Sequence, residues 1–372
     1  MIKPNPFTPQ SGWEPKIFGG RLQELDIFKS AMETAVSVRP NHLVVLGEWG
    51  KGKTSLLKQF KRIAQEKGYP ACISSISRFT GKDKPLDAIY LIAEEMLAGF
   101  PERDMDSEKL LGLFSRTNSF LQAQTQFTKF LLELWEILDT RLAVVLLDDL
   151  QNLLAISNTI DILRAVLSKE EIIQRTRFLF VLSSTPASWA IFLNKHDPVG
   201  RFFRKHLDVG NLSEEELIAT IEKTIEGSGV EFSNTIEKRI FEYTDGHPYE
   251  VQLLSSHLYD GQIEGKVDER TWDGALTNTL KELGKDYFNT LMAKASDRER
   301  DLLNILAEER RPLSIRDFRT MMIVGKHARK FPIANIKNFL YRLEEKRIVA
   351  RLGDGSFDIP DRMFREFILK NG

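Results

Sequence analysis

The sequence has one cysteine, six histidines and no long apolar run. Cys72 alone cannot form an intramolecular disulfide, and the histidines lack the spacing of metal ligands, which argues against a disulfide framework and a histidine metal site. The most apolar runs, residues 143–147 and 178–182, are far too short to span a bilayer, and residues 1–6 lack the apolar core of a signal peptide. We therefore expect a cytoplasmic protein without a membrane partner, in which Cys72 is a small core residue.

The net charge is also close to zero: the chain has 52 Lys and Arg and 53 Asp and Glu, which give a formal charge of -1. Its distribution is uneven: residues 297–372 carry 17 basic and 12 acidic side chains, a net of +5, which leaves -6 for residues 1–296. A chain of 372 residues also exceeds the size at which one hydrophobic core keeps growing. We expect two or three domains, with a modestly basic module at the C-terminal end.

Short, continuous apolar runs alternate with helical patterns in the first half of the chain. Apolar strands separated by helices are typical of a parallel sheet that is covered on both faces. We therefore predict an α/β fold with a parallel sheet between helices. The predicted strands are residues 42–46, 71–76, 142–147 and 178–183, and the helical patterns include residues 54–66, 121–138 and 161–168.

The segment between the first strand and the first of these helices matches the phosphate-loop pattern G-x-x-x-x-G-K-[ST]. Its glycines let backbone N–H groups turn toward a phosphate at a helix N-terminus. Lys53 supplies a cation to the β- and γ-phosphates, and Thr54 offers a hydroxyl to Mg²⁺. The sequence therefore predicts ATP and Mg²⁺ as cofactors. The predicted binding residues are Gly47, Glu48, Trp49, Gly50, Lys51, Gly52, Lys53, Thr54 and Ser55.

Two adjacent carboxylates follow the third apolar run, where a phosphate loop needs an acidic partner for its metal. Asp148, at the strand exit, is placed to reach Mg²⁺ directly or through water. Asp149 is placed to orient or deprotonate the attacking water, with a helix N-cap as the alternative role. We predict Thr54 and Asp148 as metal ligands, and Asp149 and Lys53 as catalytic residues.

Hydroxyls and arginines further along the chain complete the predicted chemistry. The fourth apolar run ends in residues 183–186, and among its hydroxyls we select Ser184 to touch the γ-phosphate or the attacking water, with a helix N-cap as the alternative. Arginine stabilises a transferring phosphoryl group, and we assign this role to Arg204, with Arg201 beside it and an exposed surface position as the alternative. If an arginine acts on a second chain, the ATP site lies between self-associated protomers.

Several short motifs together resemble the archaeal-type P-loop ATPases, which are related to the AAA+ origin-recognition ATPases and the STAND signalling ATPases. The resemblance implies that Phe18, Gly19 and Arg21 lie against the adenine, and that His247 and Pro248 close over the nucleotide. Asp149 stands where many AAA+ members have the longer glutamate, which implies slow hydrolysis. The motifs are residues 18–21 with Glu24 and Leu25, the loop 47–54, residues 148–149, residues 183–186 and residues 246–249.

After about residue 212, helical periodicity replaces the apolar strands, and the chain ends with three predicted helices and a hairpin turning at Gly353-Asp354-Gly355. That ending is typical of a winged helix. The predicted helices near the end are residues 298–308, 314–321 and 334–346. The predicted domains are an extended surface arm (residues 1–16), a P-loop ATPase core (residues 17–211), a helical lid (residues 212–295) and a winged-helix domain (residues 296–372).

Two functions follow from this organisation. In the first, Lys337, Arg342, Lys346, Arg347 and Arg351 meet double-stranded DNA, and ATP binding and hydrolysis set the position of the winged helix. In the second, the winged helix contacts protein, and a STAND-like signalling or scaffold ATPase uses ATP binding with slow turnover. A steep salt dependence of DNA affinity is expected only in the first.

Overall fold

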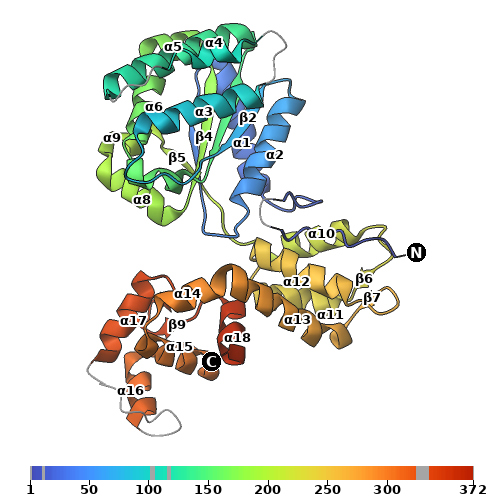
Figure 1. Ribbon diagram of the computed structural model, residues 1–372. Helices are drawn as coiled ribbons and strands as arrows, with labels where there is room; N and C mark the ends of the chain where they lie inside the picture. The colour runs from blue at the N-terminus through green and yellow to red at the C-terminus, as the bar shows by residue number, and fades with distance from the viewer. Residues whose placement is uncertain (1, 11–12, 101–104, 115–118, 324–334, 372) are drawn as a thin grey trace. The chain divides into compact units, whose positions relative to one another are not determined.

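The computed structural model describes residues 2–10, 13–100, 105–114, 119–323 and 335–371, and the chain divides into two compact units (Figure 1). The N-terminal unit comprises Gln10–Asn211, and the C-terminal unit comprises Met1–Pro9 with Leu212–Gly372. Each unit has its own hydrophobic core, so each is described by itself.

The N-terminal unit is built on a five-stranded parallel sheet with the strand order β2-β3-β4-β1-β5. This confirms the predicted α/β class, and the four predicted strands form the first four strands of the sheet. The strands are β1 (Leu43–Leu46), β2 (Ala71–Ser75), β3 (Ala143–Asp148), β4 (Phe178–Ser184) and β5 (Lys205–Asp208).

Both faces of this sheet are buried, because successive side chains along each strand point to opposite faces. Leu43 and Val45 of β1 belong to the core under α1 and α2, whereas Val44 and Leu46 belong to the core on the other face, under α3, α5 and α6. The helices are α1 (Leu22–Ser37), α2 (Lys53–Glu66), α3 (Pro85–Gly99), α4 (Ser107–Leu111), α5 (Phe120–Leu138), the 3₁₀ segment η1 (Leu150–Ile156), α6 (Thr159–Leu167), α7 (Glu170–Arg175), α8 (Pro186–Lys195) and α9 (Asp197–Phe202).

The fifth strand has no counterpart in the sequence prediction. β5 lies at the edge of the sheet beside β1, and only Leu207 among its four residues is buried. An edge strand with one buried side chain lacks the continuous apolar run by which the other strands are recognised. β5 places residues 209–211 beside the loop that follows β1.

The C-terminal unit is mainly helical and has one continuous apolar core, from Leu212 to Ile368 with Phe7. Its first helices agree with the predicted periodicity, but the expectation that only helices lie between residue 212 and the terminal hairpin is wrong, because the two-residue strands β6 and β7 pair in parallel. Such short strands leave no periodic signal. The elements are α10 (Glu214–Ile225), β6 (Glu231–Phe232), α11 (Asn234–Thr244), α12 (Pro248–Asp260), β7 (Lys266–Val267), α13 (Glu269–Leu283), the π-helical segment η2 (Gly284–Phe288) and α14 (Asn289–Lys294).

The end of the chain contains the predicted helices and hairpin together with a final helix. Leu313 pairs with Phe357, so a third short strand segment adjoins the hairpin. The final helix packs on α15 and also on α11 and α13, which joins the end of the chain to the lid segment. Position 334 of the last predicted helix lies outside the described residues. The elements are α15 (Asp297–Glu309), α16 (Ile315–Ile323), α17 (Ile336–Glu345), β8 (Ala350–Arg351), β9 (Phe357–Asp358) and α18 (Arg362–Asn371).

The N-terminal arm is more firmly packed than an extended surface segment. Phe7 is buried in the core of the C-terminal unit, the backbone N–H of Lys3 donates to Ser228 O (2.9 Å), and the Asn5 amide donates to Asp260 Oδ1 (2.8 Å). The described residues of the arm form no helix or strand, as its prolines predict, but one aromatic side chain and these hydrogen bonds anchor it.

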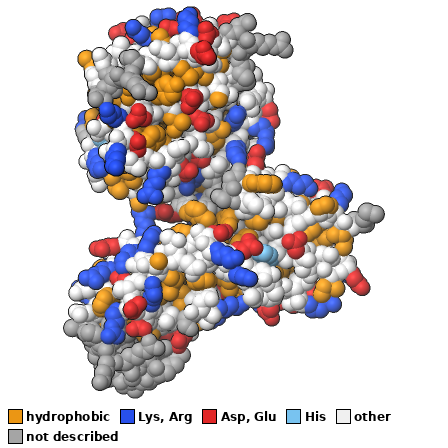
Figure 2. Space-filling model, viewed as in Figure 1, with side chains coloured by type: hydrophobic (Ala, Val, Ile, Leu, Met, Phe, Trp, Pro, Cys, Tyr) orange, Lys and Arg blue, Asp and Glu red, His pale blue; other side chains and the backbone are white. Residues whose placement is uncertain are grey.

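Charged side chains of both signs are interspersed among the described residues of the C-terminal unit on the face shown in Figure 2. Within the described ranges, no helix combines the length and the apolar character needed to cross a membrane.

Gly246 and Gly274 of the C-terminal unit differ in the space around them, so substituting each by alanine tests the geometry through protein stability. Gly246 has a φ of 70°, and a Cβ there would lie 2.0 Å from Leu212 O, whereas a Cβ on Gly274 would meet nothing within 4 Å. We expect Gly246→Ala to lower the free energy of unfolding by about 3 kcal/mol or more through strain and overlap. Gly274→Ala, in helix α13, should raise it by up to about 1 kcal/mol. Urea unfolding followed by circular dichroism measures both changes, and equal midpoints for the two variants would contradict the geometry.

Candidate nucleotide-binding site

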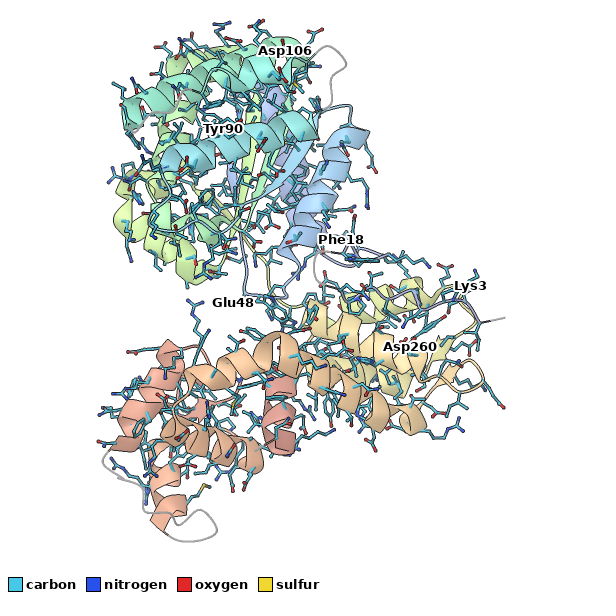
Figure 3. All side chains as sticks on the ribbon, in the orientation of Figure 1. Lys3, Phe18, Glu48, Tyr90, Asp106 and Asp260 are labelled. Carbon is cyan, nitrogen blue, oxygen red and sulfur yellow. The ribbon has the colours of Figure 1, made fainter. Side chains whose placement is uncertain are left out.

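The loop between β1 and α2 lies at the carboxyl edge of the sheet, with Glu48 on it (Figure 3). The N–H of Gly47 donates to Ser184 O on β4 (3.2 Å), and a Cβ on Gly47 would lie 2.9 Å from Val209 O, so the loop starts tightly between two neighbouring segments. Gly52 has a φ of 84° and is the N-cap of α2. The free N–H groups of the first helical turn therefore face the loop, as an anion-binding loop requires.

Lys53 is almost fully buried at the start of α2, at 9% exposure. Its ammonium donates to Glu48 O across the loop (3.1 Å). Burial lowers the pKa of Lys53, while the charges of Asp148, Asp149 and Glu48 raise it. The loop thus holds a cation close to two carboxylates, in the place where a phosphate group would be its natural partner.

Asp148, the last residue of β3, is the centre of a hydrogen-bonded cluster and is 1% exposed. Thr54 Oγ1 donates to Asp148 Oδ2 (2.6 Å), the Ser183 hydroxyl donates to Asp148 Oδ1, and the N–H of Asp149 donates to the same oxygen (3.0 Å). Hydroxyl and carboxylate oxygens are the ligands that Mg²⁺ prefers. The structure therefore brings Thr54, Asp148 and Lys53 together, as the sequence predicts.

The three hydroxyl residues at the end of β4 have different surroundings. Ser183 contacts Asp148, a role that sequence reasoning missed although residues 183–186 were recognised as relevant. Thr185 caps helix α8 by accepting from the N–H of Ser188 (3.3 Å), so the alternative role as N-cap belongs to Thr185 and not to Ser184. The Ser184 hydroxyl is buried and has no hydrogen-bond partner among the described residues. Its predicted contact with the γ-phosphate stays a prediction.

Asp149 has a φ of 57° and precedes η1, but its carboxylate accepts no hydrogen bond from a backbone N–H of that helix, so the alternative N-cap role is not formed. Its carboxylate accepts from Gln151 Nε2 (2.8 Å). Burial and the charge of Asp148 raise the pKa of Asp149 above its ordinary value. A half-buried carboxylate with a raised pKa is a stronger base than an exposed aspartate.

Arg21 supports the phosphate loop from the N-terminal side. Its guanidinium donates to Lys51 O (3.2 Å) and to Gly210 O (2.6 Å), and it forms an ion pair with Glu24 (3.5 Å). Phe18 is half-buried against the adjoining core. The structure thus connects residues 18–21 with the loop, and their contact with adenine stays a prediction.

Arg201 and Arg204 lie away from the phosphate loop within the chain. Lys205 pairs with Leu43 and Asp208 pairs with Leu46, so Arg204 lies at the amino edge of the sheet and the loop follows the carboxyl edge. The four residues of β1 separate the two edges by about 10 Å or more. A role for Arg204 at the nucleotide of the same chain therefore has no support, and a role at a second chain stays a prediction.

The predicted lid residues belong to the C-terminal unit. Pro248 is the first residue of α12, His247 is its N-cap, and Gly246 O accepts from the N–H of Leu212 (2.9 Å). Glu250 and Val251, in the first turn of α12, are buried in their own unit.

The basic residues near the end of the chain differ in their surroundings. Lys346 forms an ion pair with the buried carboxylate of Glu299 (2.7 Å), which gives it a structural role. Lys337 and Arg351 are exposed and lie over the Tyr341 ring, 5.6 and 5.3 Å from its centroid. Arg342 lies 5.7 Å from the Phe339 ring, and Arg347 is exposed after α17.

No protein-family model and no curated protein sequence matches the chain. Solved structures do match it over nearly its whole length. It is similar to a Walker-type ATPase of Pyrococcus abyssi, with 15% identity, a TM-score of 0.63 and coverage of 95% of this chain and 96% of that one. It is also similar to the ORC2 protein of Aeropyrum pernix in ADPNP-ADP complexes, with 14% identity, a TM-score of 0.65 and coverage of 97% and 96%. The chain therefore has the fold of archaeal P-loop ATPases, and the resemblance predicted from the sequence is confirmed at the level of the fold.

Proposed function

We propose that this protein binds ATP with Mg²⁺ at the loop between β1 and α2 and hydrolyses it as a nucleotide-dependent switch. The observation that carries this proposal is the cluster in which Thr54 and Ser183 donate to the buried carboxylate of Asp148 beside Lys53. The similar structures named above, a Walker-type ATPase and a protein with ADPNP and ADP, support an adenine nucleotide as the ligand.

The residues present fit a magnesium ion, because the oxygens of Thr54 and Asp148 already face one another at 2.6 Å. They would hold the ion beside the phosphates, where it neutralises negative charge. Lys53 orients the phosphates through its ammonium, and Asp149 accepts the proton of the attacking water. The short side chain of Asp149 and its hydrogen bond with Gln151 favour slow turnover.

Two substitutions in the loop separate phosphate binding from metal binding. Lys53→Ala removes the cation, and we expect ATP affinity to fall at least tenfold with or without Mg²⁺, about 1.4 kcal/mol or more. Thr54→Ala removes a hydroxyl whose hydrogen bond holds Asp148, and we expect it to weaken Mg²⁺-ATP binding while binding of ATP in EDTA changes little. Isothermal titration calorimetry measures all four cases. Equal losses for both variants in EDTA would contradict the division of roles.

The raised pKa of Asp149 predicts a pH dependence of hydrolysis. A general base is active when ionised, so turnover should increase with pH, and its midpoint should lie above the ordinary range of an aspartate because folding raises the pKa. Asp149→Asn should reduce turnover by about 10²-fold or more and abolish the increase of turnover with pH, while ATP affinity is unchanged. Steady-state phosphate release between pH 4.5 and 9 measures the turnover of the wild type and of this variant. An unchanged profile in Asp149→Asn would assign the base elsewhere.

We further propose that the nucleotide state is coupled to DNA binding by a winged-helix domain at residues 296–372. Three features support a winged helix: the helices α15, α16 and α17, the β8–β9 hairpin, and the pairing of Leu313 with Phe357. Lys337 and Arg351, both exposed and close to the Tyr341 ring, offer two cations and an aromatic ring to a nucleic acid. The alternative is a STAND-like ATPase whose C-terminal segment contacts protein, and the interspersed charges in Figure 2 favour it.

The two functions differ in a measurable way. If DNA is the partner, the double variant Lys337→Ala/Arg351→Ala should weaken duplex binding about tenfold or more and reduce the slope of log affinity against log salt by about 2. The control Lys238→Ala/Lys281→Ala removes the same charge from exposed positions of the lid segment and should change little. Fluorescence anisotropy with and without ATP measures the duplex affinity of both double variants. No DNA binding by the wild type would establish the protein-contact alternative.

Self-association belongs to the same proposal. Because Arg204 lies at the sheet edge opposite its own phosphate loop, it could reach a nucleotide only in a second chain. Turnover per chain that increases with protein concentration would support this arrangement, and a constant rate would exclude it.

A further inference from the structure

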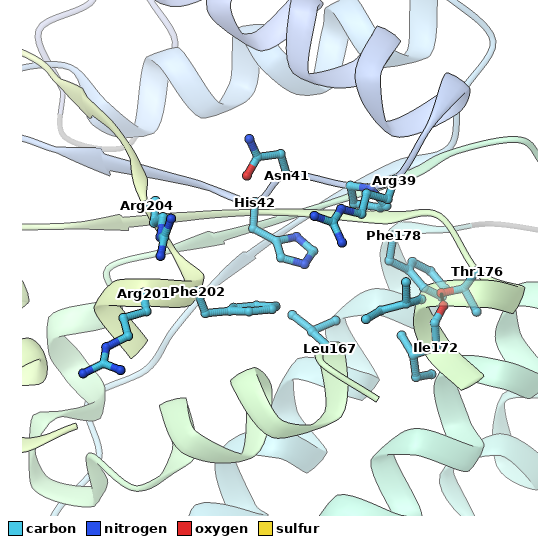
Figure 4. Close-up of a pocket in the computed structure, with 12 residues that line it drawn as sticks. Arg39, Asn41, His42, Leu167, Ile172, Thr176, Phe178, Arg201, Phe202 and Arg204 are labelled. Atoms are coloured by element: carbon cyan, nitrogen blue, oxygen red, sulfur yellow. Dashed lines mark hydrogen bonds between the residues drawn. The ribbon is translucent and has the colours of Figure 1, made fainter. Parts of the chain in front are cut away.

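A cavity of about 450 Å³ lies at the amino edge of the parallel sheet, opposite the phosphate loop. Its wall includes residues that immediately precede or begin three neighbouring strands: residues 39–42 before β1, Phe178 at the start of β4, and Arg201, Phe202 and Arg204 before β5. Helices α6 and α7 complete the wall through Leu167 and Ile172. Figure 4 shows these residues converging from separate elements. The nucleotide site does not use this cavity.

The cavity has apolar walls, three arginines and the neutral polar side chains of Asn41, His42 and Thr176. Leu167, Ile172, Phe178 and Phe202 provide aliphatic and aromatic surface. Arg39, Arg201 and Arg204 are exposed and also line the cavity, and no Asp or Glu lies among the described residues that line it. The guanidinium groups of Arg39 and Arg204 have no ion-pair or side-chain hydrogen-bond partner among the described residues. The unpaired guanidinium groups of Arg39 and Arg204, with no carboxylate in the described lining, make this a site for negative charge.

His42 adds a neutral hydrogen-bond donor to this surface. Its Nδ1 accepts from the backbone N–H of Phe180 (3.1 Å), so in the neutral ring the hydrogen lies on Nε2. Burial lowers the pKa of His42 to about 3, which keeps the ring neutral at physiological pH. The ring lies against Phe202, with centroids 5.2 Å apart (Figure 4). The backbone contact fixes the orientation of the ring in the wall, so a ligand meets a donor that is already positioned.

We propose that this cavity binds a small organic anion with an apolar, ring-sized body. The carboxylate or phosphate of the ligand pairs with Arg39, Arg201 and Arg204, and its body packs on Phe178, Phe202 and Leu167. The volume lies in the range of small-molecule sites, and apolar walls with a few convergent polar groups are their usual composition. The site lies at the other edge of the sheet from the phosphate loop, so it does not depend on nucleotide binding there, and it shares only Arg204 with the proposed self-association.

Fluorine NMR tests the proposal with three probes of one shape: 4-fluorobenzoate, 4-fluorophenyl phosphate and the neutral 4-fluorobenzyl alcohol. The experiment uses the full chain carrying Lys53→Ala, so that phosphate binding at the loop does not interfere and a failure of the nucleotide proposal leaves the result intact. We expect at least one anion to bind, with the stronger of the two identifying the head group, and the alcohol to bind at least tenfold more weakly. Binding should weaken as salt is raised.

Two further variants locate the binding. Arg39→Gln should weaken the anion about five- to tenfold, and Ile173→Trp, at a partly exposed wall position, should block entry. Arg141→Gln removes an equally exposed arginine outside the cavity and should leave binding unchanged. Thermal melting confirms that each variant is folded. The proposal is overturned if neither anion binds, if the alcohol binds as well as the anions, or if Arg39→Gln and Arg141→Gln give the same affinity.

Discussion

The carboxylate of Asp148 is the constraint on which the candidate site depends. A charge that is 1% exposed would cost several kcal/mol without partners, and its stability comes from the Thr54 and Ser183 hydroxyls and the N–H of Asp149. These partners come from three places in the chain: the start of α2, the end of β4 and the turn after β3. The carboxylate can therefore be buried only when the parallel sheet is in register, so the same interactions that hold the fold also set the geometry of the site.

The parallel sheet gives its two edges different chemistry. At the carboxyl edge, the strands lead into loops with helix N-termini, and oxygen ligands and Lys53 gather around the loop after β1. At the amino edge, the segments entering β1 and β5 carry Arg39, His42, Arg201 and Arg204 around the cavity, and β4 contributes Phe178. β1 connects the two edges over only four residues, and it is hydrogen-bonded on both sides, to β4 and to β5. A ligand at either edge therefore contacts segments that continue into the same central strand.

The sequence predicts the centre of the fold better than its periphery, for physical reasons. Buried strands such as β3 are continuous apolar runs, and the phosphate loop needs fixed residues at fixed spacing, so both leave strong local signals. β5 is exposed on one side, and the anchoring of the arm through Phe7 depends on a hydrophobic pocket formed by distant residues, so neither leaves such a signal. The roles of Ser183, Ser184 and Thr185 could not be separated because they differ only in the direction of each side chain, which the strand register sets.

The C-terminal segment is not packed as an isolated module, and this limits how a switch can work. Helix α18 joins it to the lid segment, since Arg362 lies over the Tyr243 ring of α11 at 4.4 Å. Within the segment, Arg310 forms an ion pair with Glu366 through two hydrogen bonds (2.5 and 3.1 Å), which fixes α18 to the end of α15. Helices α13 and α14 are also continuous through η2, and a Cβ on Gly284 would lie 2.6 Å from the Phe367 ring. Separating the predicted winged helix from the lid would expose a shared apolar core. A nucleotide-driven change that reaches Lys337 and Arg351 is therefore expected to move the C-terminal unit as one body.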